Sequence, residues 1–289
     1  MKYFVKIVCV WLFVFLLTGV AYNDDKNNDG LVVDSFCLAS FPHTYSRCGV
    51  GVFRPSSRMW FYDAYGNGTT DARSGPWGEA GDIPFSGDFN SDHADYIFDD
   101  VGRYNDSLKI WWYDYNHDGD TNERSPRRWE GRMQGNIPFG GDFDCDGHND
   151  DVGVFRPSTR TWYYDYNHDG TTNARISPWG WRGDIPVVGD FDRDGCTDDV
   201  AVFRPSNRMW YYDYNHDGTT DKRYGPWGLS GDLPVACDFD GDGYIDDVAV
   251  FRPFNRMWYY DYNHNGTTDK RSGPWGYRGD IPVAVMHIP

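Results

Sequence analysis

Five copies of one aromatic and acidic unit follow one another from about residue 50 to the end of the chain. The unit is clearest in VFRPSNRMWYYDYNHDGTTDKRYGPWG at 202–228 and VFRPFNRMWYYDYNHNGTTDKRSGPWG at 250–276. Its first tryptophan recurs as Trp60, Trp111, Trp162, Trp210 and Trp258, so the period is 51, 51, 48 and 48 residues. Such a period is typical of propeller blades or solenoid coils. Because one unit cannot bury its own apolar face, the 289-residue chain is predicted to hold one repeat array.

Each unit contains four short segments with strand character. DVAVFRP is a β-branched run ended by proline, and RMWYYDY follows it closely, so the two are predicted to form a hairpin. A third strand is expected over TDKRYGP. A fourth is expected at the IPV segments, which lie at 83–85, 137–139, 185–187, 233–235 and 281–283. Four short strands per unit are typical of a propeller blade.

The two ends of the array complement each other. The chain enters at VGVFRP (50–55), already a second strand, and leaves after IPVAV (281–285), a first strand. We therefore predict an all-β, five-bladed β-propeller over 50–289, in which the C-terminal strand completes the first blade and removes the exposed sheet edges. The alternative is an open stacked array that exchanges this strand with other copies.

Three units carry an acidic DxDxDG loop between the predicted first and second strands: 142–150, 190–198 and 238–246. Oxygen ligands at positions one, three, five and nine, a backbone carbonyl at seven and a glycine at six are typical of calcium loops. The predicted ligands are Asp142, Asp144, Asp146, His148 and Asp150; Asp190, Asp192, Asp194, Cys196 and Asp198; and Asp238, Asp240, Asp242, Tyr244 and Asp246. The alternative is an acidic turn held by Asx hydrogen bonds alone.

Other loops follow this pattern less closely. In 88–99, Asp88, Asn90 and Asp92 match, but His93 stands at the glycine position and three extra residues precede Asp99. A second set, the DxNxDG loops, follows the aromatic strands. Its candidate ligands are Asp114, Asn116, Asp118 and Asn122; Asp165, Asn167, Asp169 and Asn173; Asp213, Asn215, Asp217 and Asp221; and Asp261, Asn263, Asn265 and Asp269. We expect weaker or empty calcium sites there, with plain Asx turns as the alternative.

The segment DFDGDGYIDDVAVFRP at 238–253 resembles the FG-GAP or VCBS-type repeat of integrin-like β-propellers, in which a strand, a DxDxDG calcium loop and a second strand recur in each blade. The resemblance covers about 240 residues. It implies calcium-bound blades, extracellular placement and binding rather than catalysis. The shorter unit, the count of five and the additional DxNxDG loops depart from integrin blades.

The N-terminal part of the chain has no repeats. Residues 1–21 combine two early lysines, an apolar run and a small-residue ending, which predicts a secretory signal peptide and no membrane span after its cleavage. In the lead segment 22–49, Cys37 and Cys48 are predicted to form a disulfide in the exported chain. The pairing of Cys145, Cys196 and Cys237 stays open. The net charge of −17 makes nucleic acid an unfavourable partner.

Departures from the repeat give the candidate ligand-binding residues. Trp181 and Tyr277 follow the Pro-Trp-Gly turn, where aromatic rings can stack on sugars. Trp129 and Arg103 lie in the second unit, whose sequence departs most from the repeat. The alternative to a binding role is that the sequence of this one blade has simply drifted. Asn105 is the clearest candidate for N-glycosylation. The two Arg-Gly-Asp tripeptides, at 182–184 and 278–280, are attributed to the repeat, and the histidines of the DxNHDG loops to solvated positions.

Together these features predict a secreted, non-enzymatic protein that binds structural calcium and acts as an adhesion or carbohydrate-binding module. The expected partner is a carbohydrate or a cell-surface protein. One alternative is a self-assembling subunit of a filament or surface layer, joined to copies of itself by strand exchange. The other is a polysaccharide-active enzyme on a propeller scaffold, for which the sequence nominates no acid and base pair.

Overall fold

The computed structural model describes residues 47–90, 100–125, 129 and 134–286. The chain divides into two compact units, 1–41 and 42–289, and every described residue belongs to the second. The predicted signal peptide 1–21 and most of the lead segment therefore lie outside the described residues. The part of the chain that is described contains no helix long and apolar enough to cross a membrane.

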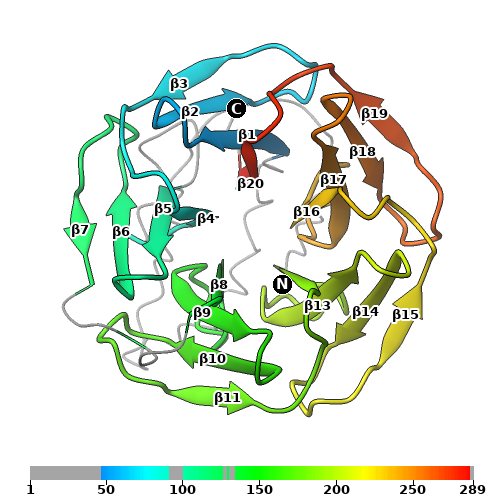
Figure 1. Cartoon of the computed structure of the whole chain (residues 1–289). Coiled ribbons are helices and arrows are strands. Elements are labelled where there is room, and N and C mark those ends of the chain that lie inside the picture. The colour runs from blue at the N-terminus through cyan, green and yellow to red at the C-terminus, as the bar shows by residue number, and fades with distance from the viewer. Residues whose placement is uncertain (1–46, 91–99, 126–128, 130–133, 287–289) are drawn as a thin grey trace, which may run out of the picture. The chain divides into compact units, whose positions relative to one another are not determined.

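The described residues form five four-stranded antiparallel blades around a central axis (Figure 1), as predicted. In each blade the IPV strand is innermost, and the other three strands follow outward in sequence order; in blade 1 the innermost strand is the C-terminal β20. Blade 1 contains β20 (Ile281–Met286), β1 (Cys48–Arg54), β2 (Met59–Asp63) and β3 (Ala72–Ser74); blade 2 contains β4 (Ile83–Gly87), β5 (Asp100–Asn105), β6 (Ile110–Asp114) and β7 (Glu123–Arg124). Blade 3 contains β8 (Ile137–Gly141), β9 (Asp151–Arg156), β10 (Thr161–Asp165) and β11 (Ala174–Ile176). Blade 4 contains β12 (Ile185–Gly189), β13 (Asp199–Arg204), β14 (Met209–Asp213) and β15 (Lys222–Tyr224); blade 5 contains β16 (Leu233–Cys237), β17 (Asp247–Arg252), β18 (Met257–Asp261) and β19 (Lys270–Ser272).

The C-terminal strand closes the ring. β20 pairs antiparallel with β1 of the same chain, with Gly51 opposite Val283 and Phe53 opposite Ile281. This confirms the closure that the array ends predict, and β1 begins at Cys48, two residues before the predicted start of the array. In this structure, β20 therefore completes blade 1 of its own chain.

Aromatic side chains build the core between the blades. The third strand of each blade carries a tryptophan that is at most 1% exposed: Trp60, Trp111, Trp162, Trp210 and Trp258. The tryptophans of the Pro-Trp-Gly turns tie each blade to the next through an Nε1–H that donates to a threonine hydroxyl. The five bonds run from Trp77 to Thr121, Trp129 to Thr172, Trp179 to Thr220, Trp227 to Thr268 and Trp275 to Thr70, at 3.0–3.2 Å. The last of these bonds joins blade 5 to blade 1.

The antiparallel order gives the ring two different faces. Loops between the first and second strands and between the third and fourth strands emerge on one face, which we call the Asp-loop face. Loops between the second and third strands, and the links from one blade to the next, emerge on the other, which we call the arginine face. Figure 1 looks onto the arginine face, where the β15–β16 and β19–β20 links lie in front of the strands.

Candidate metal centres on the Asp-loop face

Three groups of carboxylates converge on the Asp-loop face. They are Asp142, Asp144 and Asp146; Asp190, Asp192 and Asp194; and Asp238, Asp240 and Asp247, and in each group the ligand atoms lie within 4.8 Å of one another. The groups come from the β8–β9, β12–β13 and β16–β17 loops. Most of these residues are those predicted from the DxDxDG pattern, so the fold brings the expected side chains together.

The first aspartate of each loop organises the turn. The Asp142 carboxylate accepts hydrogen bonds from the backbone N–H groups of Asp146 and Gly147, both at 3.0 Å. Asp238 accepts equivalent bonds from Asp242 at 3.1 Å and Gly243 at 2.9 Å. These first aspartates are only 4–5% exposed, whereas Asp144 and Asp146 are exposed at the rim of the loop. Each loop thus has a buried carboxylate at its base and exposed carboxylates at its rim.

An aspartate at position ten, which the motif analysis missed, closes each loop. It is the first residue of the second strand in blades 3, 4 and 5: Asp151, Asp199 and Asp247. The Asp199 carboxylate accepts from the N–H of Asp192 and the Asp247 carboxylate from that of Asp240, each at 2.7 Å. The doubled Asp-Asp at positions nine and ten was the signal in the sequence. In the third cluster, Asp247 joins Asp238 and Asp240 in place of the predicted Asp242, and the predicted position-nine ligands Asp150, Asp198 and Asp246 are in none of the three clusters.

Burial makes these carboxylates costly to ionise without a counter-charge. It raises the pKa of Asp151, Asp199 and Asp247 to about 8, and nearby carboxylates such as Asp144, Asp192 and Asp240 add to the effect. Burial also raises the pKa of Asp198 and Asp246 to about 6. One buried oxygen of Asp190, one of Asp199 and one of Asp246 accept no hydrogen bond. An all-oxygen donor set with raised pKa values and unused buried oxygens fits a hard cation such as Ca²⁺.

An arginine already occupies part of the third loop. Arg193, at position four of the second loop, reaches the third loop and forms ion pairs with Asp242 at 3.0 Å and Asp246 at 2.9 Å. Asp242 is absent from the third cluster of converging carboxylates. The third loop therefore offers Asp238, Asp240 and Asp247 as its free anionic ligands, and its predicted ligands at positions five and nine are shared with Arg193.

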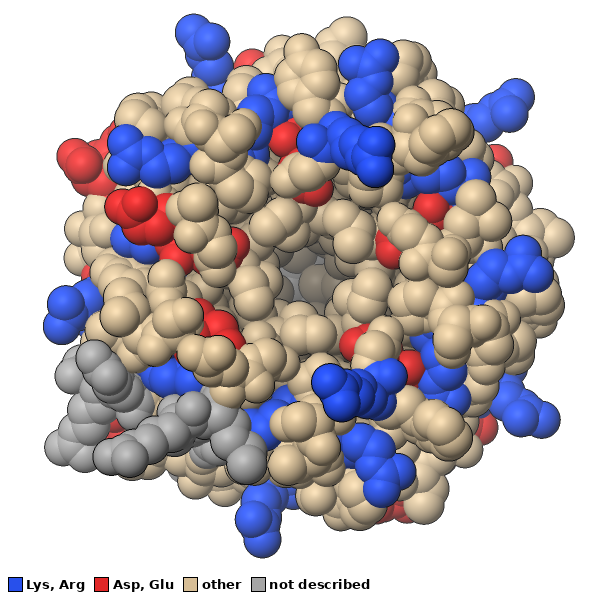
Figure 2. Space-filling view, viewed as in Figure 1, with Lys and Arg blue, Asp and Glu red and all other residues tan. Residues whose placement is uncertain are grey.

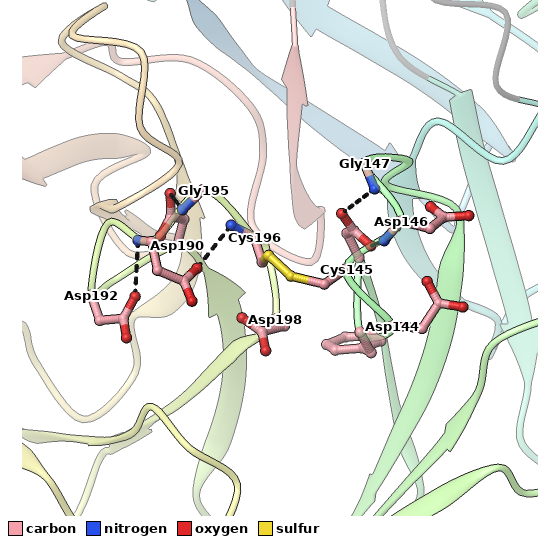
Figure 3. The surroundings of a disulfide bond; sticks show 12 residues. Asp144, Cys145, Asp146, Gly147, Asp190, Asp192, Gly195, Cys196 and Asp198 are labelled. Atoms are coloured by element: carbon pink, nitrogen blue, oxygen red, sulfur yellow. Dashed lines mark hydrogen bonds between the residues drawn. A yellow bond between two sulfur atoms is a disulfide. The ribbon is translucent and has the colours of Figure 1, made fainter.

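A disulfide joins the first loop to the second. Cys145 and Cys196 are bonded, with their Cα atoms 5.5 Å apart, and Figure 3 shows the bond between the two aspartate clusters. Cys145 is at position four of its loop and Cys196 at position seven. The sequence left the pairing of these cysteines open. Covalent and ionic links therefore connect the acidic loops of blades 3, 4 and 5.

The predicted Cys37–Cys48 disulfide is wrong. Cys48 is bonded to Cys237, with their Cα atoms 6.0 Å apart, while Cys37 lies outside the described residues. Cys48 begins β1 in blade 1 and Cys237 ends β16 in blade 5, and the Cys48 N–H donates to the Asp238 carbonyl at 2.8 Å. Proximity in sequence suggested the first pairing, whereas ring closure brings together residues 189 positions apart. This bond covalently links blades 1 and 5 where the ring closes.

The 88–99 loop is described only in part. Asp88 is buried, and the Asn90 N–H donates to the Asp100 carboxylate at 3.2 Å, which repeats the position-ten contact of the other loops. Asp92 and Asp99 lie outside the described residues. The prediction of a calcium ligand set in this loop stays a prediction.

The DxNxDG loops have the same backbone conformation and form internal hydrogen bonds, although one buried oxygen each of Asp114, Asp165 and Asp213 accepts no hydrogen bond. Position four takes a positive φ in both sets, as at Cys145 (62°), Arg193 (64°) and His216 (58°). The Asp213 carboxylate accepts from the Gly218 N–H at 2.9 Å, and that of Asp221 accepts from the Tyr214 N–H at 2.7 Å. In the described residues no group of three acidic or histidine ligands converges in this set. These contacts are those of the Asx-turn alternative, and calcium binding by this set stays a prediction.

The loop histidines are not solvated residues, which corrects the expectation from the sequence. His264 is 7% exposed, and its Nε2 contacts the carbonyl of Asp246 in the same blade. Its ring stacks on Tyr212 of the preceding blade at a centroid distance of 5.3 Å. Burial lowers the pKa of His264 to about 4, so the ring is neutral at pH 7. His168 and His216 make the same two contacts, so these histidines connect the blades.

On the arginine face, the candidate ligand residues separate into two groups. Trp181 is 62% exposed and Tyr277 is 56% exposed, as a ligand-binding role requires. Trp129 is 3% exposed and is the Pro-Trp-Gly tryptophan of its blade, which the altered sequence around it disguised. Its predicted role as a ligand residue is wrong, because its ring is packed against Trp111 at a centroid distance of 5.8 Å.

Arg103 is also a structural residue. Four other blades use the arginine of Val-Phe-Arg-Pro: Arg54 pairs with Asp280, Arg204 with Asp184 and Arg252 with Asp232, at 2.7–2.8 Å, and Arg156 donates to Asn136 at 3.0 Å. In blade 2, Asn105 occupies the corresponding strand position and Arg103, two residues earlier, supplies the guanidinium that pairs with Asp82 at 2.5 Å. Its predicted role in ligand binding is therefore wrong.

These pairs also account for two other sequence features. The aspartates of both Arg-Gly-Asp tripeptides, Asp184 and Asp280, are at most 2% exposed and are held by Arg204 and Arg54. They belong to the repeat, as the sequence indicated. The Asn105 side-chain nitrogen, to which a glycan would be attached, donates to Asp82 at 2.7 Å in a half-buried position. This contact disfavours the predicted glycosylation.

No protein-family model and no curated protein matches the chain. Solved structures give weak matches. A protein of unknown function from Bacteroides caccae is 10% identical, with a TM-score of 0.43 over 79% of this chain and 73% of that one. A GH74 enzyme from Niastella koreensis is 13% identical, with a TM-score of 0.41 over 78% of this chain and 30% of that one. BBS1N, solved in complex with ARL6DN, is 12% identical, with a TM-score of 0.40 over 83% and 74%. At these values the matches carry no argument about function.

Proposed function

We propose that this chain is a secreted, calcium-stabilised propeller of the FG-GAP or VCBS kind that works by binding a carbohydrate at a cell surface, without chemistry of its own. The observation that carries the calcium part is the convergence of three groups of carboxylates, each within 4.8 Å, on one face of the ring. Burial first, and repulsion by neighbouring carboxylates second, raise the pKa of Asp151, Asp199 and Asp247 beside these groups to about 8, so the loops resist ionisation without a counter-charge.

Calcium would be held by Asp142, Asp144 and Asp146 in blade 3, with Asp151 closing the loop. In blade 4 the equivalent ligands are Asp190, Asp192 and Asp194, and in blade 5 they are Asp238, Asp240 and Asp247. When bound, the ion supplies positive charge that replaces protons on the buried carboxylates. Because the loops come from successive blades that are tied by Cys145–Cys196 and Arg193, filling them would stiffen one side of the ring.

Two disulfides support extracellular placement, since such bonds persist in oxidising compartments and are rare in the cytosol. The exposed Trp181 and Tyr277 support carbohydrate as the ligand. The strand-exchanged filament is less favoured, because β20 already pairs with β1 of its own chain.

The test is a calorimetric titration of the purified, chelator-treated chain with calcium, followed by binding to a panel of immobilised polysaccharides with and without calcium. We expect saturable calcium binding and retention on at least one polysaccharide that weakens after chelation. Absence of calcium binding at millimolar concentration would contradict the metal assignment. Retention on no polysaccharide would contradict the carbohydrate assignment.

A further inference from the structure

The links between blades differ at two adjacent positions on the arginine face. The four described links carry Glu79-Ala80, Trp181-Arg182, Leu229-Ser230 and Tyr277-Arg278. All four make the same turn, in which the N–H of the buried aspartate donates to the carbonyl of the first of these residues at 3.0–3.2 Å. The fold therefore does not require an aromatic residue or an arginine at either position. Two links nevertheless have both, and the other two have neither.

The Trp181 link borders a pocket of about 160 Å³ between blades 3 and 4. Its walls include Trp181, Tyr211, Arg160 and Arg204. The Arg204 guanidinium lies 4.9 Å from the Trp181 ring and 4.2 Å from the Tyr211 ring, and Asp184 neutralises it. Arg160 and Arg182 are exposed and form no ion pair with any described residue. The pocket thus combines an exposed indole ring with one available cation, Arg160, and a second exposed arginine, Arg182, follows Trp181 in the same link.

The Tyr277 link repeats this arrangement between blades 5 and 1. The Arg54 guanidinium lies 4.1 Å from the Tyr277 ring and is neutralised by Asp280. Arg256, which corresponds to Arg160, lies 5.9 Å from the same ring. Arg256 and Arg278 are exposed and pair with no carboxylate in the described part of the chain.

The two remaining links lack this combination. Arg58, which corresponds to Arg160, pairs with Glu79 at 3.7 Å, so its charge is opposed by the residue that replaces the aromatic. Arg208 faces a link that carries Leu229 and Ser230 instead of an aromatic residue and an arginine. Arg208 is exposed and unpaired among the described residues, so the feature that distinguishes the other two junctions is an exposed ring followed by a second arginine, Trp181-Arg182 and Tyr277-Arg278.

We propose that these two junctions are two copies of a binding site for a uronic acid unit of an acidic polysaccharide. The aromatic ring offers a flat apolar surface to one face of the sugar. The arginine forks match the planar carboxylate, which they can bind through two parallel N–H bonds. The chain carries a net charge of −17, and Figure 2 shows Lys and Arg side chains spread around the rim of this face with Asp and Glu side chains among them. Favourable charge for an anionic ligand is supplied locally, by the arginines of the two junctions that pair with no described carboxylate. The inference rests on the proposed carbohydrate-binding role and narrows it to anionic sugars.

The experiment is calorimetric titration of the full chain with short oligogalacturonates in calcium at low salt, with neutral dextran fragments as the comparison. We expect two sites per chain and weaker binding as salt is raised. The variant Trp181→Leu with Arg182→Ser gives this junction the Leu229-Ser230 sequence, which the fold already accepts, and is expected to leave one site. The same change at Tyr277 and Arg278 in addition is expected to weaken binding by about tenfold or more.

Matched controls come from the junction between blades 4 and 5. Arg208→Gln is expected to leave binding unchanged, whereas Arg160→Gln is expected to weaken one site. Both arginines have a positive φ, 62° at Arg208 and 56° at Arg160, so the two substitutions have the same effect on the backbone. The converse variant, Leu229→Trp with Ser230→Arg, is expected to add a third site.

Two unchanged sites in the Trp181 and Arg182 variant would overturn the proposal. Equal affinity for dextran, equal affinity for dextran sulfate, or tighter binding of single-stranded DNA would also overturn it. If neutral saccharides bind and oligogalacturonates do not, this inference fails while the carbohydrate-binding function stands. If no saccharide binds, both fail.

Discussion

The two faces of the ring use the repeat in opposite ways. On the Asp-loop face, the blades with DxDxDG loops place aspartates at the same positions, and adjacent loops are tied by Cys145–Cys196 and by Arg193. On the arginine face, the buried Arg–Asp pairs recur, but the neighbouring exposed residues change from Glu79 to Trp181 to Leu229. In a repeat protein, positions that recur hold the blades together. Positions that vary among equivalent turns are free to serve a ligand.

The Asp-loop face contains a second comparison. The DxDxDG and DxNxDG loops share the left-handed residue at position four and the same backbone contacts to the first aspartate. They differ in charge, because Asn replaces aspartate at position three in the second set, and in the aspartate at position ten. Because the two sets share their backbone geometry but differ in charge, we expect calcium to bind the DxDxDG loops more tightly than the DxNxDG loops.

Removal of calcium is expected to give the largest effect. If three loops are each filled at about ten times their Kd, calcium contributes about 4 kcal/mol to the free energy of unfolding. For a domain of this size that corresponds to a decrease in Tm of about 10 °C on chelation. Differential scanning calorimetry with and without chelator measures it. An unchanged Tm would mean that the Asp-loop face needs no metal.

Breaking a buried pair on the arginine face comes next. Arg204→Met leaves Asp184, which is 1% exposed, without its ion-pair partner, and is expected to lower stability by about 2–3 kcal/mol. Urea unfolding in calcium measures the change. Arg160→Gln, on the same face but without an ion pair to a described carboxylate, is the control and is expected to have almost no effect on stability. Similar losses in both variants would remove the distinction between the buried, ion-paired arginines and the exposed arginines of this face.

A matched pair of substitutions in blade 4 separates the two loop sets. Asp194→Asn removes a carboxylate at position five of the DxDxDG loop, and Asp217→Asn removes one at position five of the DxNxDG loop. The first is expected to eliminate one calcium site and to lower the Tm in calcium by about 3 °C, whereas the second has a smaller effect. Calcium titration of both variants checks the site count. Equal loss of calcium binding in both variants would show that the difference in charge does not make the two loop sets differ in calcium affinity.

The smallest effect concerns pH. The pKa of Asp151, Asp199 and Asp247 is about 8 in the folded chain, well above the value near 4 of an unfolded chain. The metal-free folded form therefore binds more protons than the unfolded form between these values, so its stability decreases as pH rises toward 8. We expect the Tm of chelated protein to fall by a few degrees from pH 6.5 to pH 8.5, and to change less in calcium. A Tm of chelated protein that rises with pH would contradict this.

The blade architecture could be predicted from the sequence because the period, the β-branched and aromatic runs and the offset of the two ends all point to one closed ring. The metal-ligand candidates followed from the spacing of the aspartates. What the sequence did not reveal depends on contacts between blades: Cys48 with Cys237, Arg193 with Asp246, and the histidines that stack on the preceding blade. Trp129 was misjudged because the Pro-Trp-Gly pattern around it is altered.

The most direct measurement is native mass spectrometry of the purified chain in millimolar calcium, with the Asp194→Asn variant alongside. At least three bound calcium ions per wild-type chain, one fewer in the variant and none after chelation are expected from the three carboxylate clusters. A chain that binds no calcium under these conditions would contradict the assignment of the Asp-loop face as a metal-binding surface.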